Sequence, residues 1–101
     1  MKLQLSAAAI TILIPASAIA TNRAQISPSE MMAAIKIADP AQLDGINAAE
    51  ATASSIRVKR CIGPDEEPTE FECVWQTRGK DGWINHKNWL AIDGRGWHFI
   101  D

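Results

Sequence analysis

The chain has no tyrosine and only two cysteines, two histidines and two phenylalanines among its 101 residues. No serine or free thiol lies in a nucleophile motif, no glycine-rich loop precedes a helix start, and no pair of carboxylates is visibly placed for glycoside hydrolysis. The cysteines and histidines also lack the spacing of a known zinc site. The sequence therefore predicts no catalytic residue, no metal and no cofactor.

An excess of positive charge is also missing. Ten Lys and Arg residues stand against twelve Asp and Glu residues, which gives a net charge of −2. A nucleic-acid-binding protein of this size usually shows a concentrated basic face. We therefore expect no nucleic-acid partner, and a periplasmic or extracellular protein is the kind of partner that the composition allows.

The first twenty residues are typical of a secretory signal peptide. Lys2 precedes an apolar run over residues 3–14, and the segment ends in Ala18-Ile19-Ala20, with small residues two apart. We expect cleavage after this segment, which leaves residues 21–101 as one small domain in the periplasm or outside the cell. The alternative is an uncleaved membrane anchor, but Pro15 and several polar residues interrupt a run that is barely long enough to span a bilayer.

Cys61 and Cys73 permit a single intramolecular pairing, and in an exported chain they predict a structural disulfide. In the chain-entropy model, closing a loop of this size stabilises the folded state by about 3 kcal/mol. A small domain benefits from such a bond because its core is modest. A redox pair is the alternative, but the C-x-x-C spacing that lowers a thiol pKa is absent.

A helix start follows an N-terminal arm, residues 21–26, in which no pattern is visible. Ser27 has the character of an N-cap, Pro28 of a first helical residue and Glu30 of the returning member of a capping box. Apolar residues then recur at helical spacing as far as Asp39-Pro40. The same signals repeat at that pair and predict a second, short helix, which glycine and serine residues weaken.

From Ile56 onward the apolar period changes to two. Two strands are predicted within residues 56–78, a third over 83–92 and a fourth over 97–100, with short turns between the last three. Such short connections favour an antiparallel meander. The sequence therefore predicts an α+β fold, in which one helix or two short helices pack on a four-stranded antiparallel β-meander with one disulfide.

The predicted disulfide conflicts with strict alternation. In the second strand Cys73 shares a face with Trp75, whereas in the first strand Cys61 falls with basic residues such as Lys59. Disulfide-bonded cysteines must lie on the same side of a sheet. We therefore expect a β-bulge with Arg60 as the extra residue; without a bulge, the basic residues would share a face with Trp75.

All four tryptophans follow residue 74. The plainer interpretation is that they fill the core and form cross-strand pairs. The alternative is an exposed aromatic surface that binds a peptide, a glycan or a partner protein. Trp83 and Trp89 are the better candidates, because alternation places them on one face with Asn85 and Lys87.

The loop between the two cysteine strands, residues 63–70, carries Asp65, Glu66 and Glu67 and no basic residue. The plainer interpretation is a solvated loop tip. The alternative is a rigid acidic knob, held at its base by the disulfide, that inhibits a secreted hydrolase by entering a basic groove. Calcium binding is a lesser alternative, because the ligand pattern of the known calcium loop is missing.

The two histidines, His86 and His98, fall by alternation on the same side as Leu90. A catalytic interpretation would make one of them a general base oriented by Asp93 or Asp101. The interpretation we favour is two partly exposed histidines without a chemical role.

The N-terminal helix, the cysteine hairpin and the final segment DGRGWHFID together resemble small exported proteins of Gram-negative bacteria. The C-terminal half is also similar in pattern to the last strands of cystatin-like and nuclear-transport-factor-like folds. This second resemblance implies small-ligand binding or weak catalysis, but residues 21–101 are too few for the full pocket of the latter fold. Our leading hypothesis is a non-enzymatic binding or protein-interaction module.

Overall fold

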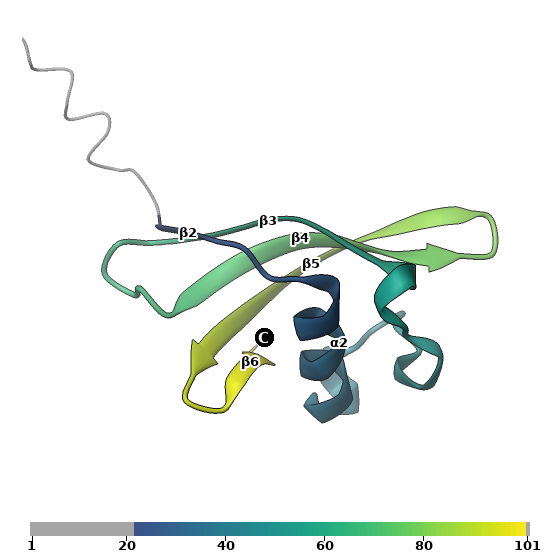
Figure 1. Ribbon diagram of the computed structural model, residues 1–101, viewed down its shortest axis with the longest axis horizontal. Helices are drawn as coiled ribbons and strands as arrows, with labels where there is room; N and C mark the ends of the chain where they lie inside the picture. Colours follow the sequence, from purple (N-terminus) through teal and green to yellow (C-terminus); the bar gives the residue numbers. More distant parts are fainter. Residues whose placement is uncertain (1–21, 101) are drawn as a thin grey trace, which may run out of the picture.

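The computed structural model describes residues 22–100, so the predicted signal peptide lies outside the described residues. One α-helix, three short 3-10 helices and five β-strands make up this part of the chain (Figure 1). None of the helices within residues 22–100 has the length and apolar character needed to cross a membrane.

The helix α2 (Pro28–Ile37) begins as the sequence predicts. The Glu30 N–H donates a hydrogen bond of 3.1 Å to Ser27 Oγ, and the Ser27 N–H donates one of 2.8 Å to Glu30 Oε1. These two bonds complete the capping box and satisfy backbone donors that a helix start leaves free. The helix ends before Pro40, as predicted. Its buried side chains are Met31, Ala34 and Ile35.

The predicted second α-helix is wrong. Residues 39–55 instead contain three separate 3-10 turns, η2 (Pro40–Gln42), η3 (Ala48–Glu50) and η4 (Ala53–Ser55). The Asp39 N–H does donate to Gln42 Oε1 at 3.1 Å, so the start signal is present. The helix stops after one turn: Leu43 leaves the helical conformation with φ −110° and ψ 40°, and Gly45 then takes a left-handed φ of 77° that a regular helix cannot accommodate.

The five strands form one antiparallel sheet in chain order. They are β2 (Asn22–Ala24), β3 (Ile56–Gly63), β4 (Glu70–Gly79), β5 (Gly82–Asp93) and β6 (Gly96–Phe99). The α+β class and the meander of the last four strands are confirmed, but the strand count is five. The additional strand is β2, which lies in the segment predicted to be a loose N-terminal arm. It pairs with the end of β3.

The core lies between α2 and one face of the sheet (Figure 1), where the helix contacts β3 and β6. Trp75 is fully buried there, and the centroid of its ring lies 6.0 Å from that of Phe99 in an edge-on arrangement. Trp97 is buried against Phe71, with ring centroids 5.6 Å apart. Two of the four tryptophans therefore fill the core, as the plainer interpretation predicts.

The disulfide between Cys61 and Cys73 is confirmed, and the two residues lie directly opposite each other in the register of β3 and β4. The predicted bulge is also present, but the extra residue is Lys59. Val58 lies opposite Trp75, and the next paired residue on β3 is Arg60. The prediction of Arg60 as the extra residue was therefore wrong by one position. The insertion of Lys59 turns Cys61 toward the core while Arg60 keeps its place in the ladder.

Candidate binding surface

The face of the sheet opposite α2, here called the outer face, is left uncovered by the elements within residues 22–100 (Figure 1). Strand alternation and register determine which side chains lie on it. From β3 to β5 its paired positions are Arg57, Arg60, Ile62, Glu70, Glu72, Val74, Gln76, Arg78, Trp83, Asn85, Lys87, Trp89 and Ala91.

Trp83 lies between two arginines on the outer face. The Arg57 guanidinium carbon is 3.8 Å from the centroid of the Trp83 ring, and that of Arg78 is 5.4 Å from it. Arg78 is the cross-strand neighbour of Trp83, whereas Arg57 reaches the ring from β3. Cation–π contacts of this kind hold a planar guanidinium in place and leave its edge free to donate hydrogen bonds.

Neither of these arginines has a carboxylate partner among the described residues. The ion pairs found there join Asp93 to Arg95 and to His98, at the β5–β6 turn. Two oriented guanidinium groups therefore face solvent without a neutralising anion from residues 22–100. Guanidinium edges bind carboxylate, sulfate or phosphate groups in bidentate fashion.

The four outer-face residues that the sequence singled out on β5 do share one face, but they do not form one platform. Trp83 and Trp89 are six residues apart along an extended strand, which corresponds to about 20 Å. Asn85 accepts a hydrogen bond of 2.7 Å from the Gln76 side chain between them. Trp89 lines a separate cavity of about 330 Å³ together with other outer-face residues, among them Lys87.

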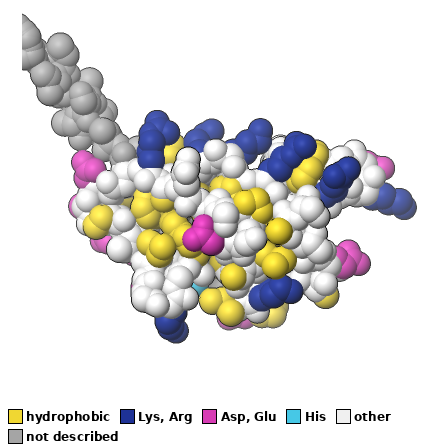
Figure 2. All heavy atoms as spheres, in the orientation of Figure 1, with side chains coloured by type: hydrophobic (Ala, Val, Ile, Leu, Met, Phe, Trp, Pro, Cys, Tyr) yellow, Lys and Arg dark blue, Asp and Glu magenta, His cyan; other side chains and the backbone are white. Residues whose placement is uncertain are grey.

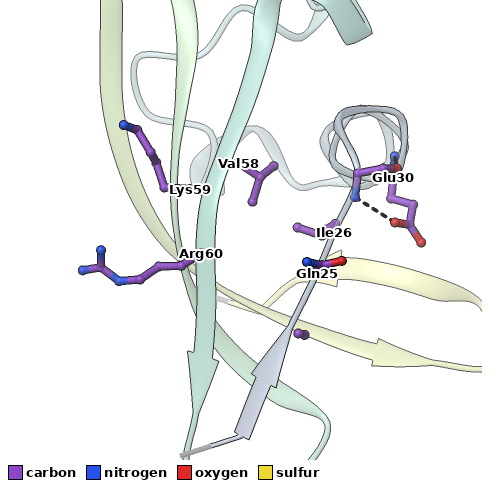
Figure 3. Close-up of a pocket in the computed structure, with 8 residues that line it drawn as sticks. Gln25, Ile26, Glu30, Val58, Lys59 and Arg60 are labelled. Carbon is purple, nitrogen blue, oxygen red and sulfur yellow. Dashed lines mark hydrogen bonds between the residues drawn. The ribbon is translucent and has the colours of Figure 1, made fainter.

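The bulge on β3 adds a cation to the outer face. Figure 3 shows Lys59 and Arg60 pointing away from α2, whereas Val58 points toward it. A bulge can place two successive side chains on one face, which strict alternation cannot do. The sequence carries no signal that distinguishes Lys59 from Arg60 as the extra residue. Sequence reasoning therefore missed the basic character of this face.

A cavity of about 380 Å³ lies beside β3, where the chain leaves the sheet after Ala24, and Figure 3 draws the residues that line it. Its walls come from Val58 on β3 and from the segment 25–27 that leads into α2. The carboxylate in this cavity belongs to Glu30, which already accepts the capping hydrogen bond from Ser27. The cavity is therefore a gap between diverging chain segments, and its carboxylate, that of Glu30, is already engaged in the capping box.

The acidic loop lies at the end of the sheet opposite to Trp83. Its tip consists of two successive turns, in which the Glu67 N–H donates to the Pro64 carbonyl at 3.2 Å and the Glu70 N–H donates to the Glu67 carbonyl at 3.1 Å. Asn22 Nδ2 of β2 also donates to the Pro64 carbonyl at 3.1 Å. Asp65, Glu66 and Glu67 are exposed on this ordered tip.

The two histidines lie on opposite faces, so the prediction that they share a side was wrong. His86 pairs with Trp75 on the covered face, whereas the two-residue turn before β6 places His98 beside Ala91 and Phe99 beside Leu90. His86 Nε2 lies 2.8 Å from Thr77 Oγ1, and burial lowers the pKa of this imidazole.

No carboxylate of residues 22–100 lies within ion-pair distance of His86. His98 Nδ1 is 3.8 Å from Asp93 Oδ2, which is too long for a hydrogen bond. A backbone hydrogen bond from Arg95 lowers the pKa of the Asp93 carboxyl. Asp101, the other candidate orienting group, lies outside the described residues. Among the described residues, Asp93 thus lies within ion-pair distance of His98 without hydrogen-bonding it, and His86 has no such neighbour.

Within the part of the chain that the structure describes, no three His, Cys, Asp or Glu side chains are grouped so that they could hold a metal ion. Comparisons of the chain with protein-family models, with curated proteins and with solved structures find no match.

Proposed function

We propose that the protein is a non-enzymatic binding module and that it holds a negatively charged partner on the outer face of its sheet. The observation that carries this proposal is the stack of Arg57, Trp83 and Arg78 on that uncovered face. Tryptophan and arginine are the residues most enriched at binding hot spots. Within the described residues the two guanidinium groups lack an acidic partner, so a bound anion would supply it.

The scaffold under this stack is suited to binding. Trp83 lies in the long β4–β5 hairpin, whose strands are paired along their whole length from Glu70 to Ala91. The disulfide joins β4 of this hairpin to β3, which carries Arg57. Side chains that are already oriented lose less conformational entropy when they bind, so more of the contact energy appears as affinity.

The proposal includes export. A disulfide such as Cys61–Cys73 is typical of proteins that fold in an oxidising compartment, and residues 1–20 have the composition of a signal peptide. The partner is then a periplasmic or extracellular molecule, in keeping with the resemblance to exported proteins of Gram-negative bacteria.

Capture experiments test the proposal. The oxidised chain from residue 21 onward, immobilised at its C-terminus, is incubated with envelope extract of the producing cells at low salt. We expect it to retain an anionic partner that raised salt releases, because salt screens exposed charges. The Arg57→Gln/Arg78→Gln variant should lose this partner. A matched variant that also removes two positive charges, Lys36→Gln/Arg95→Gln, should keep it, and equal capture by all three proteins would contradict the proposal.

The ordered acidic tip supports a second candidate function, inhibition of a secreted hydrolase. The turns at Pro64 and Glu67 and the bond from Asn22 fix the backbone that carries the exposed carboxylates before any partner arrives. If a hydrolase is captured from the envelope extract, the wild-type protein should inhibit it. The Glu66→Gln/Glu67→Gln variant should no longer inhibit this hydrolase, whereas Arg57→Gln/Arg78→Gln should still do so. Unchanged inhibition by the acidic-tip variant would exclude this function.

A further inference from the structure

The arginines of the outer face follow a line across the sheet. Arg23 on β2 lies opposite Ile62, and Arg60 is the preceding outward residue of the β3 ladder. Arg57 follows beyond the bulge, and Arg78 comes next, near the end of β4. Each step moves one row along the strands, about 7 Å, so the four arginines span about 20 Å. We call them the cationic line.

Figure 2 shows the same arrangement in space. Lys and Arg side chains follow one edge of the molecule, over β2 and β3 and on toward the β4–β5 turn. Lys59 extends the row from the bulge, and its side chain points away from α2 (Figure 3). No carboxylate within residues 22–100 forms an ion pair with any of these residues. Glu72 lies in the same row as Arg23, opposite Ile62, but forms no such pair, so the arginines still repel one another and a bound polyanion would relieve this repulsion.

We propose that the outer face binds a linear acidic polysaccharide, which lies along the cationic line and places its carboxylate or sulfate groups on the arginines. This inference rests on the proposed function and names the class of its partner. A chain with a charge at regular intervals can neutralise all four arginines at once, whereas a small anion can neutralise only one or two. The extended shape of the line therefore favours a linear polymer.

The tryptophans distinguish this partner from a single-stranded nucleic acid. Proteins that bind single strands without sequence preference offer free aromatic rings on which bases stack. The ring of Trp83 is instead covered by the Arg57 guanidinium at 3.8 Å and flanked by that of Arg78. Trp89 lies off the line, opposite Glu72. The line thus offers four guanidinium groups, two of them oriented by Trp83, and no free ring, so it selects for charge and spacing.

Titration calorimetry of the oxidised chain from residue 21 onward tests the inference, with polygalacturonate as the probe. The matched probes are neutral dextran, the galacturonic acid monomer and an oligothymidylate of similar charge. We expect the polymer to bind, and dextran and the monomer to give no measurable heat. The logarithm of the affinity should fall linearly with the logarithm of salt concentration, because binding releases counterions.

The Arg23→Gln/Arg60→Gln variant separates the line from the Arg57–Trp83–Arg78 stack, because it leaves the stack intact. It should bind polygalacturonate about tenfold more weakly, with a salt slope reduced by about two. Lys36→Gln/Arg95→Gln should behave as the wild type. A cooperative thermal unfolding transition of each variant serves as the control that the variant is folded.

Three results would overturn the inference. If oligothymidylate binds as tightly as polygalacturonate or more tightly, the face binds nucleic acid instead. If the galacturonic acid monomer binds as tightly as the polymer, the site holds a single anionic group and no extended chain. Unchanged affinity of Arg23→Gln/Arg60→Gln for polygalacturonate would show that the polymer does not bind along the cationic line. If that variant also captures the anionic partner while Arg57→Gln/Arg78→Gln does not, the proposed function stands and only the polysaccharide is excluded.

Discussion

At the scale of single residues, Trp83 connects the fold to the proposed function. Its ring lies on the outer face and orients the side chains of Arg57 and Arg78. An exposed cation–π contact contributes about 0.5–1 kcal/mol. Trp83→Leu should therefore lower the free energy of unfolding by only about 1 kcal/mol, as measured by urea denaturation.

The same substitution should weaken capture of the anionic partner severalfold, because both guanidinium groups lose their fixed orientation. Trp83→Phe, which retains an aromatic face, should recover part of the affinity. If Trp83→Leu loses stability but binds as well as the wild type, the stack has a structural role alone.

His86 is the residue whose environment predicts a pH dependence of stability. Burial lowers its pKa from 6.5 in the folded chain, so the unfolded chain takes up a proton at His86 first as the pH falls. The free energy of unfolding should then decrease as the pH falls from 7 through about 6.5 and below, and this loss ends below the folded-state pKa. In urea denaturation at pH 7, 6 and 5, His86→Gln should show a shallower decrease than the wild type. Parallel curves would show that His86 does not contribute.

At the scale of elements, the β3–β4 hairpin depends on the disulfide. Cys61 and Cys73 close a loop at one end of the sheet. The Cys61→Ala/Cys73→Ala variant should lose about 3 kcal/mol of folding free energy, chiefly because its unfolded chain is less restricted. Urea denaturation of the variant beside the oxidised and reduced wild type measures this loss. A variant as stable as the oxidised protein would show that the bond adds nothing.

Gly63, the last residue of β3, allows the same hairpin to close. A Cβ atom at this position would meet the Glu70 carbonyl oxygen of β4 and touch the Phe71 ring. Gly63→Ala should therefore force the strands apart and cost about 2 kcal/mol of stability. Gly94→Ala is the matched control, because its Cβ meets no atom within 4 Å. Equal melting temperatures for the two variants would contradict the close approach.

The elements that could be predicted from the sequence are those with local signals. The capping box at Ser27 and the two-residue turn before Gly82 each have a recognisable chemistry. β2 has three residues and exists because it pairs with β3, so its sequence shows no period. The bulge followed from the positions of the two cysteines, but a period of two cannot decide whether Lys59 or Arg60 is the extra residue.

At the scale of the whole molecule, the net charge of −2 conceals a separation of charge. The acidic tip lies beyond Gly63 at one end of the sheet, and the cationic line runs from Arg23 beside that end to Arg78 near the other, an order that only the fold assigns. The sequence indicated Trp83 and Lys87 as surface residues, but it could not show that Arg57 and Arg78 join Trp83. That grouping depends on which face α2 covers and on the register of three strands.

The separation of charge leads to a final prediction, which distinguishes local from overall electrostatics. Glu66 and Glu67 lie beyond Gly63, and six residues of β3 place Arg57 about 20 Å from Gly63. At 0.15 M salt charges are screened over about 8 Å, so the acidic tip should scarcely affect an anion bound at Arg57. Glu66→Gln/Glu67→Gln should therefore change the affinity for the anionic partner captured at the Arg57–Trp83–Arg78 stack less than about twofold, whereas Arg57→Gln/Arg78→Gln, which changes the net charge by the same amount in the opposite direction, should lower it about tenfold. If net charge governed binding, the two variants would shift the measured affinity by similar factors in opposite directions, and the stack would have no special place.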